Sequence, residues 1–168
     1  MQLVADEAGV AVQTVYFTFG SKARLLAEVE GRAILGDAPS ESWRDRPWAA
    51  QMQREQDPRK LIRLFVDVDT EIKGRLAPLI ASVGGALSTD PQAQDRRDTG
   101  RDSFFTSLVH RLEVLGALRQ EVTAGRALDV IRVINTPSAF IDLTMRRGWS
   151  RDDWKTWMTD LLCSQLLA

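Results

Sequence analysis

Apolar residues recur along most of this chain at spacings of three and four, which is the pattern of helices with one buried face. The clearest stripe consists of Leu61, Leu64, Phe65, Val68 and Ile72. No segment alternates apolar and polar residues as a half-buried strand would, and no internal repeat occurs. The pattern therefore predicts an all-α protein.

Cap residues followed by proline predict where several helices begin, because proline at the first helical position loses no hydrogen bond. These pairs are Asp57-Pro58, Asp90-Pro91 and Thr136-Pro137. We expect the helix after Pro58 to end at Gly74, and a long helix to run from about residue 91 to residue 118. Ser150 and Asp153 have the spacing of a capping box and predict the start of the last helix.

The first 22 residues predict two short helices joined by a glycine turn, followed by the start of a third. Gly9 is placed where a positive φ ends the first helix without steric cost. Gly20 ends the second helix, and Ser21 can cap the third. Two short helices in this order are typical of a helix-turn-helix, which places its second helix in the major groove of DNA.

Several residues of this segment resemble the TetR family of transcriptional regulators. They are Ala8-Gly9-Val10, Thr14-Val15-Tyr16, Phe19, Ser21-Lys22 and Leu25-Leu26. The end of the chain is also similar to many TetR-type regulators, through Asn135-Thr136-Pro137-Ser138, Arg147-Gly148-Trp149-Ser150 and a closing helix rich in Trp and Leu. The resemblance implies an all-helical homodimer, with small DNA-binding heads and larger domains that bind an effector and dimerise.

Two features depart from the family pattern. Ala11 stands where the family usually has Ser or Thr before the recognition helix, which removes a cap worth about 1 kcal/mol. The family's first helix has no counterpart before Leu3, so we expect a truncated or mis-started regulator. Two hypotheses stay open: a regulator that binds operator DNA, and a dimeric ligand-binding or interaction module that no longer binds DNA.

The expected DNA contacts lie in and just after the second helix. They are Gln13, Thr14, Tyr16, Thr18 and Lys22. Gln13 can bond to adenine through two hydrogen bonds, and Thr14 can reach base edges or a thymine methyl group. Tyr16 and Lys22 are suited to phosphate oxygens, Lys22 with the help of a helix N-terminus. The alternative is that Tyr16 belongs to the core and Gln13 is merely solvated.

Composition predicts three parts: a partial DNA-binding head at 1–36, a linker at 37–57, and an effector-binding and dimerisation domain at 58–168. Trp43 and Trp48 in the linker are expected to dock on the body. The whole chain has a formal net charge of −1. The head has three cationic and four acidic side chains, which is again −1 and poor for binding DNA.

The body supplies candidates for two further sites, although most of these side chains also suit a plain core. An apolar effector pocket is expected to use Phe65, Ile80, Val83, Phe104, Leu108 and Phe140. A dimer interface is expected to use Phe140, Leu143, Trp154, Trp157, Met158, Leu161 and Leu162.

Enzymatic function is not expected. His110 is the only histidine, and no cluster has the spacing of metal ligands or of a phosphate-binding loop. We expect no cofactor and no metal. Cys163 is the only cysteine, which fits a cytoplasmic protein with an inert buried thiol. The partners we expect are palindromic double-stranded DNA, a small hydrophobic effector that relieves repression, and a second copy of the chain, with no membrane.

Overall fold

The computed structural model describes residues 1–36, 42–82 and 91–168, without the side chains of 92–94, 96 and 97. All of its regular elements are helices, as expected from the sequence. They are α1 (Gln2–Glu7), α2 (Val12–Phe19), α3 (Lys22–Leu35), the 3₁₀ turn η1 (Trp43–Asp45), α4 (Pro47–Arg54), α5 (Pro58–Ser82), α6 (Pro91–Val114), α7 (Ala124–Ile134), α8 (Pro137–Ile141), the π-helical turn η2 (Asp142–Arg146) and α9 (Arg151–Leu166).

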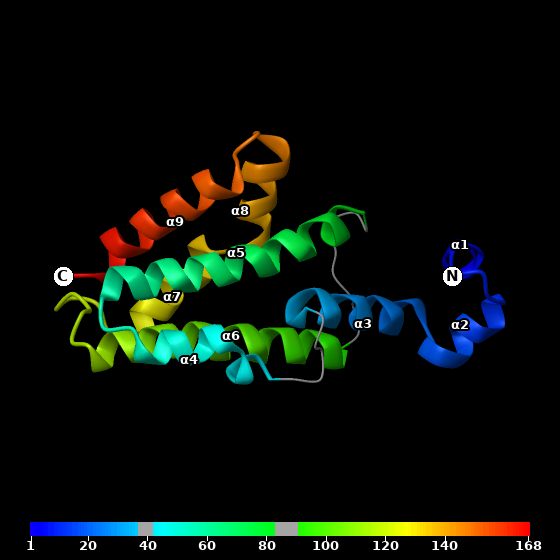
Figure 1. Cartoon of the computed structure of the whole chain (residues 1–168), viewed down its shortest axis with the longest axis horizontal. Coiled ribbons are helices and arrows are strands. Elements are labelled where there is room, and N and C mark those ends of the chain that lie inside the picture. The colour runs from blue at the N-terminus through cyan, green and yellow to red at the C-terminus, as the bar shows by residue number, and fades with distance from the viewer. Residues whose placement is uncertain (37–41, 83–90) are drawn as a thin grey trace.

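The N-terminal segment folds as the predicted helix-turn-helix. Gly9 has a φ of 65° and Gly20 a φ of 73°, so each glycine makes a turn that L side chains rarely adopt. Ala5 of α1 and Val15 of α2 are the buried residues where the two helices meet. Figure 1 shows this head at one end of the molecule, joined to the body by α3.

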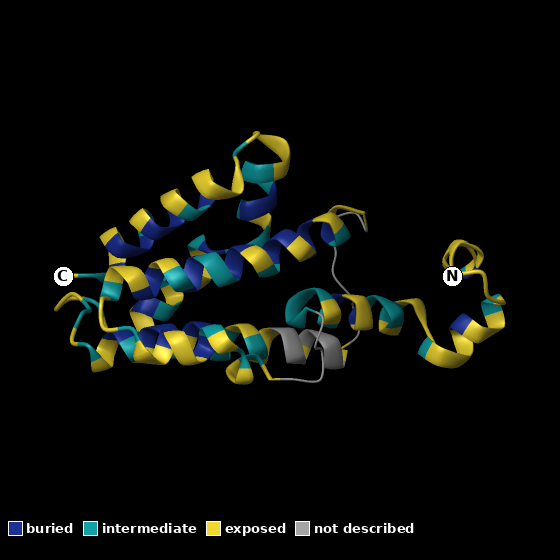
Figure 2. Cartoon of the chain, viewed as in Figure 1, coloured by how far each residue is buried: buried dark blue, intermediate teal, exposed yellow. Residues whose placement is uncertain are grey.

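The body is built around α5, which packs against α9, α3 and α4, while α6 packs against α7. The buried stripe predicted on α5 includes Leu61 and Phe65, both wholly buried. Leu108 of α6 and Trp154 of α9 are also wholly buried in the same core. Figure 2 shows buried positions concentrated on the facing sides of the body helices, whereas α1 and α2 are mostly exposed.

The prediction that a helix ends at Gly74 was wrong, because α5 continues through Gly74 and Pro78 to Ser82. Continuing the helix buries Leu76 and Ile80, and this apolar burial offsets the hydrogen bond that Pro78 cannot make. Gly74 instead allows a close approach. A Cβ atom built on it would lie 2.7 Å from the Cζ atom of Arg151.

Most predicted helix caps form. Asp57 accepts two backbone N–H groups at the start of α5, and Thr136 accepts one at the start of α8. Ser150 and Asp153 form both bonds of the capping box at the start of α9. Asp90 lies outside the described residues. Each of these caps therefore satisfies one or two of the N–H groups that have no partner at the start of its helix.

α6 ends at Val114, earlier than the predicted residue 118. Gly116 has a φ of 63° and terminates the helix. The chain after this turn pairs with the C-terminus: the Arg119 amide donates to the Leu166 carbonyl at 3.0 Å, and the Ala168 amide donates to the Ala117 carbonyl at 3.2 Å.

The described part of the expected linker packs on the body. Trp43 and Trp48 stack with their ring centroids 5.8 Å apart. Both rings meet Phe104 edge-on, at 5.6 Å and 5.4 Å. Met52 of α4 is buried in the core. This segment is therefore held by aromatic and apolar contacts rather than acting as a free tether.

Candidate nucleic-acid interface

The outward face of α2 carries four exposed side chains: Gln13, Thr14, Phe17 and Thr18. Their spacings of three and four residues place them on one side of the helix. The hydroxyl of Thr18 donates to the Thr14 carbonyl at 2.9 Å, which leaves its oxygen free to accept. The face therefore offers amide, hydroxyl and aromatic groups together, without any charge.

Phe17 was not among the predicted contacts, yet it is the most exposed large apolar side chain of the head, at 93%. The sequence contained a usable signal, since Phe17 follows Gln13 by four residues and Thr14 by three. An aromatic ring in this position cannot belong to the core of the head. It is suited to apolar contact with thymine methyl groups.

The two predicted phosphate contacts flank this face. Tyr16 is 50% exposed, so its hydroxyl is accessible, and Lys22 is exposed in the first turn of α3. Ser21 caps the same helix by accepting the Arg24 amide at 3.2 Å. Lys22 thus stands beside the positive end of the α3 dipole, where an anion is favoured.

The acidic side chains of the head belong to α1 and α3 rather than to α2. Asp6 and Glu7 are on α1, and Glu28 and Glu30 are on α3. Because α2 has no charged residue, the attraction of this head to phosphate depends on side chains that flank the helix, chiefly Lys22.

The head is attached to the body through the C-terminal end of α3. Arg75 of α5 donates from Nε to the Ala33 carbonyl at 2.7 Å and from Nη2 to the Ile34 carbonyl at 3.3 Å. Arg46 donates to the Leu35 carbonyl. We call these two side chains and their three carbonyl partners the arginine clamp. It fixes α3, and with it the head, to two separate elements of the body.

A compact pair of helices with an exposed second helix and a cationic side chain at the start of the next helix is the arrangement of a helix-turn-helix. Residues 1–29 match the family described as "Bacterial regulatory proteins, tetR family". This segment of the chain is therefore a DNA-binding helix-turn-helix of the tetR-family type. A comparison with curated proteins finds no match.

The residues expected to line an effector pocket are core residues in this structure. Phe65, Ile80, Phe104, Leu108 and Phe140 are all buried in one cluster. Phe65 and Phe104 stack with centroids 4.7 Å apart. Val83 lies outside the described residues.

The residues expected at a dimer interface fall into two groups. Phe140, Trp154, Met158 and Leu162 are buried inside the chain's own core. Leu143, Trp157 and Leu161 remain at least partly accessible, and Trp157 is 37% exposed. Any contact with a second copy through this region is limited to the accessible group.

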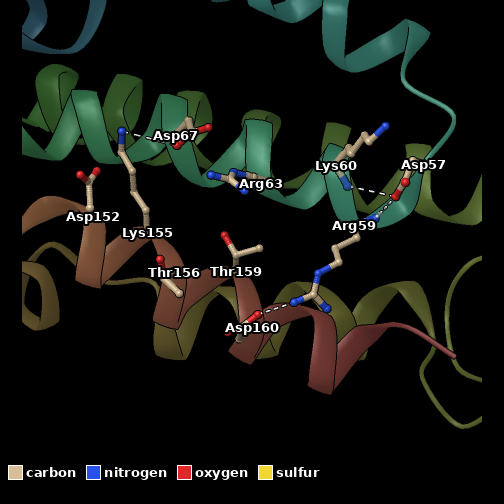
Figure 3. A pocket seen from close by; sticks show the side chains of 10 residues that line it. All are labelled: Asp57, Arg59, Lys60, Arg63, Asp67, Asp152, Lys155, Thr156, Thr159 and Asp160. Carbon is tan, nitrogen blue, oxygen red and sulfur yellow. Dashed lines mark hydrogen bonds and ion pairs between the residues drawn. The ribbon is translucent and has the colours of Figure 1, made fainter.

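A charged cleft of about 840 Å³ lies between α5 and α9 (Figure 3). Arg59 and Asp160 form an ion pair near one end, and Lys155 bridges to Asp67 at 3.4 Å near the other. Its lining has four carboxylates and four cationic side chains, so their charges balance. Exposed pairs of this kind contribute little to stability, typically below about 1 kcal/mol each.

The body also contains a buried polar cluster. Lys73 of α5 donates to Asp69 and, at 2.6 Å, to the Oδ1 atom of Asn135. The Nδ2 group of Asn135 donates to Asp69 at 3.0 Å, so the three side chains bond one another in a ring. Nothing in the sequence pattern separated Lys73 from a surface lysine, and this cluster was not predicted.

No described helix is long and apolar enough to span a membrane. Within the same residues, no group of three or more His, Cys, Asp or Glu side chains is placed to hold a metal ion. Cys163 is buried, and burial raises the pKa of its thiol, which disfavours the reactive thiolate.

Proposed function

We propose that this protein is a homodimeric, cytoplasmic transcriptional repressor that binds a palindromic operator and is released from it by a small hydrophobic effector. The observation that carries the DNA-binding part is the exposed, uncharged outer face of α2 beside Lys22 at the start of α3. Two such helices in a dimer read half-sites about 34–36 Å apart, which is one turn of DNA.

Within each half-site, some side chains of α2 contact base edges, while others, together with Lys22 of α3, contact the DNA backbone. Gln13 forms paired hydrogen bonds with adenine, while Thr14 and Phe17 contact thymine methyl groups. Tyr16 and Lys22 hold phosphate oxygens on either side, and Thr18 is a weaker candidate for the same role. These roles are supported by the exposure of all six side chains.

Dimerisation is proposed to use the exposed side of α9 and the neighbouring turn. The accessible apolar side chains there are Leu143, Met145, Trp157 and Leu161, and Met145 is 50% exposed. Trp149 supports Trp157 edge-on at 5.7 Å, which holds a large aromatic surface in place. Aromatic and Met side chains are the kinds that interfaces favour.

Regulation is proposed to pass from the body to the head through the arginine clamp. An effector that enters the body beside Phe65 and Phe140 displaces α5, because both side chains pack in the core that α5 contributes to. α5 holds the last turn of α3 through Arg75, so its movement turns the head. A few kcal/mol of differential affinity between two head positions is enough to release DNA.

The test is selection of bound duplexes from a random-sequence pool, followed by fluorescence anisotropy of the selected duplex at two salt concentrations. We expect a palindrome, binding that weakens with salt, and loss of selectivity in Gln13→Ala. Leu161→Asp should give monomers in sedimentation and bind the palindrome more weakly. A folded dimer that selects no sequence would overturn the proposal and favour a module that does not bind DNA.

A further inference from the structure

The cleft between α5 and α9 is lined by polar side chains alone (Figure 3). Its volume is about 840 Å³, and charged side chains and two threonines form its lining. Such a cleft offers no apolar side chain to a hydrophobic effector, whose proposed place is the core beside Phe65 and Phe140. A ligand that fits the cleft is therefore hydrophilic, and its site is separate from that core.

Most charges of the cleft already have a partner. Arg59 pairs with Asp160 near one end, and Lys155 lies 3.4 Å from Asp67 near the other. Asp57 accepts two backbone amides at the start of α5, which commits its carboxylate to that helix end. These groups hold the two walls of the cleft, so few of its charges are available to a ligand.

Arg63 of α5 carries a charge that is available. It is exposed and forms no hydrogen bond or ion pair with any residue that the structure describes. Figure 3 shows it in the middle of the cleft, whereas Lys60 points away from α9 and the carboxylate of Asp152 lies at the Lys155 end. A guanidinium presents a planar fork of N–H donors that matches a carboxylate. Arg63 is therefore suited to bind an anion in the cleft.

Thr159 of α9 supplies a second unused donor. Its side chain is only 8% exposed, yet its hydroxyl has no hydrogen-bond partner among the described residues. Thr18 and Thr144 instead donate to the carbonyl four residues earlier, at 2.9 Å and 2.7 Å. Figure 3 shows Thr159 opposite Arg63, with its side chain facing α5. A nearly buried hydroxyl without an internal partner, in the wall of a cleft, is available to a ligand.

The charges of the lining favour an anion with a single negative charge. Four carboxylates and four cationic side chains line the cleft, so one further negative charge is opposed by the carboxylates and held mainly by Arg63. A phosphate carries a charge of about −1.5 to −2 at pH 7 and would be opposed more strongly. A carboxylate carries one charge and can accept two parallel hydrogen bonds from a guanidinium.

We propose that this cleft binds a small hydrophilic carboxylate, which accepts hydrogen bonds from the Arg63 guanidinium on one wall and the Thr159 hydroxyl on the other. Thr156, which is exposed one turn earlier on α9, is placed to donate to the same ligand. The inference does not depend on the proposed function, because the site is distinct from both the DNA-binding face and the apolar core.

The experiment compares gluconate with sorbitol, which has the same hydroxylated chain but no carboxylate. Each is titrated into the whole protein at constant ionic strength, and binding is followed through the chemical shifts of backbone amides. We expect gluconate to shift amides of α5 and α9 near Arg63 and Thr159, and sorbitol to shift none of them. Inorganic phosphate, titrated in the same way, should bind more weakly than gluconate.

Two variants remove the two donors separately. Arg63→Gln removes the charge and keeps a polar side chain, and Thr159→Val removes the hydroxyl and keeps the branched shape. Each should weaken gluconate binding about tenfold, because each deletes a hydrogen bond to a charged group. The matched controls are Arg126→Gln on α7 and Thr106→Val on α6, which make the same changes at exposed positions outside the cleft. Both controls should leave the affinity for gluconate unchanged.

Four outcomes overturn the inference. They are no binding of gluconate, equal binding of sorbitol, phosphate binding as tight as that of gluconate, and variants at Arg63 and Thr159 that behave like their controls. Equal binding of phosphate would show that the cleft selects negative charge rather than a carboxylate. Because the Thr159 hydroxyl has no internal partner, Thr159→Val should keep the thermal midpoint, so lost binding in that variant reports on the site rather than on folding.

Discussion

The Nε group of Arg75 donates to the backbone carbonyl of Ala33 at 2.7 Å, which ties the C-terminal part of α5 to the last turn of α3. The last four carbonyls of a helix have no partner within it. In α3 the Arg32 carbonyl accepts the Gly36 amide at 2.7 Å, and the arginine clamp satisfies the next three. The end of the helix that bears the head is thus completed by the body.

Arg75→Ala should loosen the head without unfolding the body. Loss of charge-assisted bonds at an exposed helix end costs about 0.5–1 kcal/mol. We expect faster hydrogen exchange in the last turn of α3 and a broader distance distribution between spin labels placed at Gln13 and Ser164. Amides in the middle of α5 should keep their protection.

The matched control for this prediction is Arg119→Ala. Arg119 donates from Nε to the Leu167 carbonyl at 2.8 Å, at the C-terminal end of α9 and far from the head. This change removes the same kind of bond and should leave the label distances unaltered. Equal broadening in both variants would mean that the clamp does not set the position of the head.

Lys22 and Phe17 are expected to affect DNA binding in different ways. Lys22→Ala should weaken binding similarly on all sequences and reduce the salt slope by about 1, because one phosphate contact is lost. Phe17→Ala should weaken the selected duplex but leave binding to unrelated duplexes almost unchanged. Anisotropy titrations at several salt concentrations measure both effects. A uniform loss for Phe17→Ala would assign the ring to the fold of the head instead.

The helix-turn-helix could be predicted from the sequence because its signals are local. Gly9, Gly20 and Ser21 determine turns and a cap from their own chemistry, and each does so in the structure. The prediction at Gly74 was wrong because the role of this residue is not determined by its neighbours in the sequence. What a glycine does inside a helix depends on a neighbour from elsewhere in the chain, in this case Arg151, and no pattern near residue 74 indicates it.

The candidate sites also include features that local sequence determines and features that only tertiary packing determines. Exposure on α2 follows from helical spacing, so the exposure of Gln13 and Thr14 could be predicted from the sequence, and that of Phe17 could have been. The ring of Asp69, Lys73 and Asn135 could not, since Asn135 is distant from Lys73 in sequence and the two meet only through tertiary packing. A lysine on a predicted amphipathic helix is ordinarily solvated.

Gly74→Ala should stabilise the protein despite the close approach of Arg151. The atoms nearest to an added Cβ all belong to the Arg151 guanidinium, at 2.7–3.0 Å. That group is the end of a flexible, half-exposed side chain, whose ion pair with Glu71 at 3.7 Å is weak. Alanine is favoured over glycine in a helix by about 1 kcal/mol. The unfolding midpoint in urea should therefore rise, and a fall would show that Arg151 is held in place.

Lys73 and Asp69 should behave as a coupled pair in a double-mutant cycle. Lys73→Met leaves Asp69 as a buried carboxylate without its cation, at a cost on the order of 3–5 kcal/mol. Asp69→Leu combined with Lys73→Met removes both charges and should recover much of that loss. Urea unfolding of the two single variants and the double variant measures the coupling. Additive effects would mean that solvent reaches the pair.

Asp153 should give the protein part of its sensitivity to acid. Hydrogen bonds from the Ser150 hydroxyl and backbone amide hold the pKa of this carboxyl below its usual 3.8. A carboxyl whose pKa is depressed by folding stabilises the folded state above its unfolded pKa, and that contribution is lost as pH falls through the folded value.

The variant Asp153→Asn keeps a side-chain oxygen that can accept these hydrogen bonds, but its amide cannot titrate. The difference in thermal midpoint between the unaltered protein and this variant should therefore be constant above about pH 5 and shrink below pH 3.8, as the unaltered protein loses its advantage. Other carboxyls titrate in the same range, but they do so in both proteins, so a difference that stays constant down to pH 2 would remove Asp153 from the acid response.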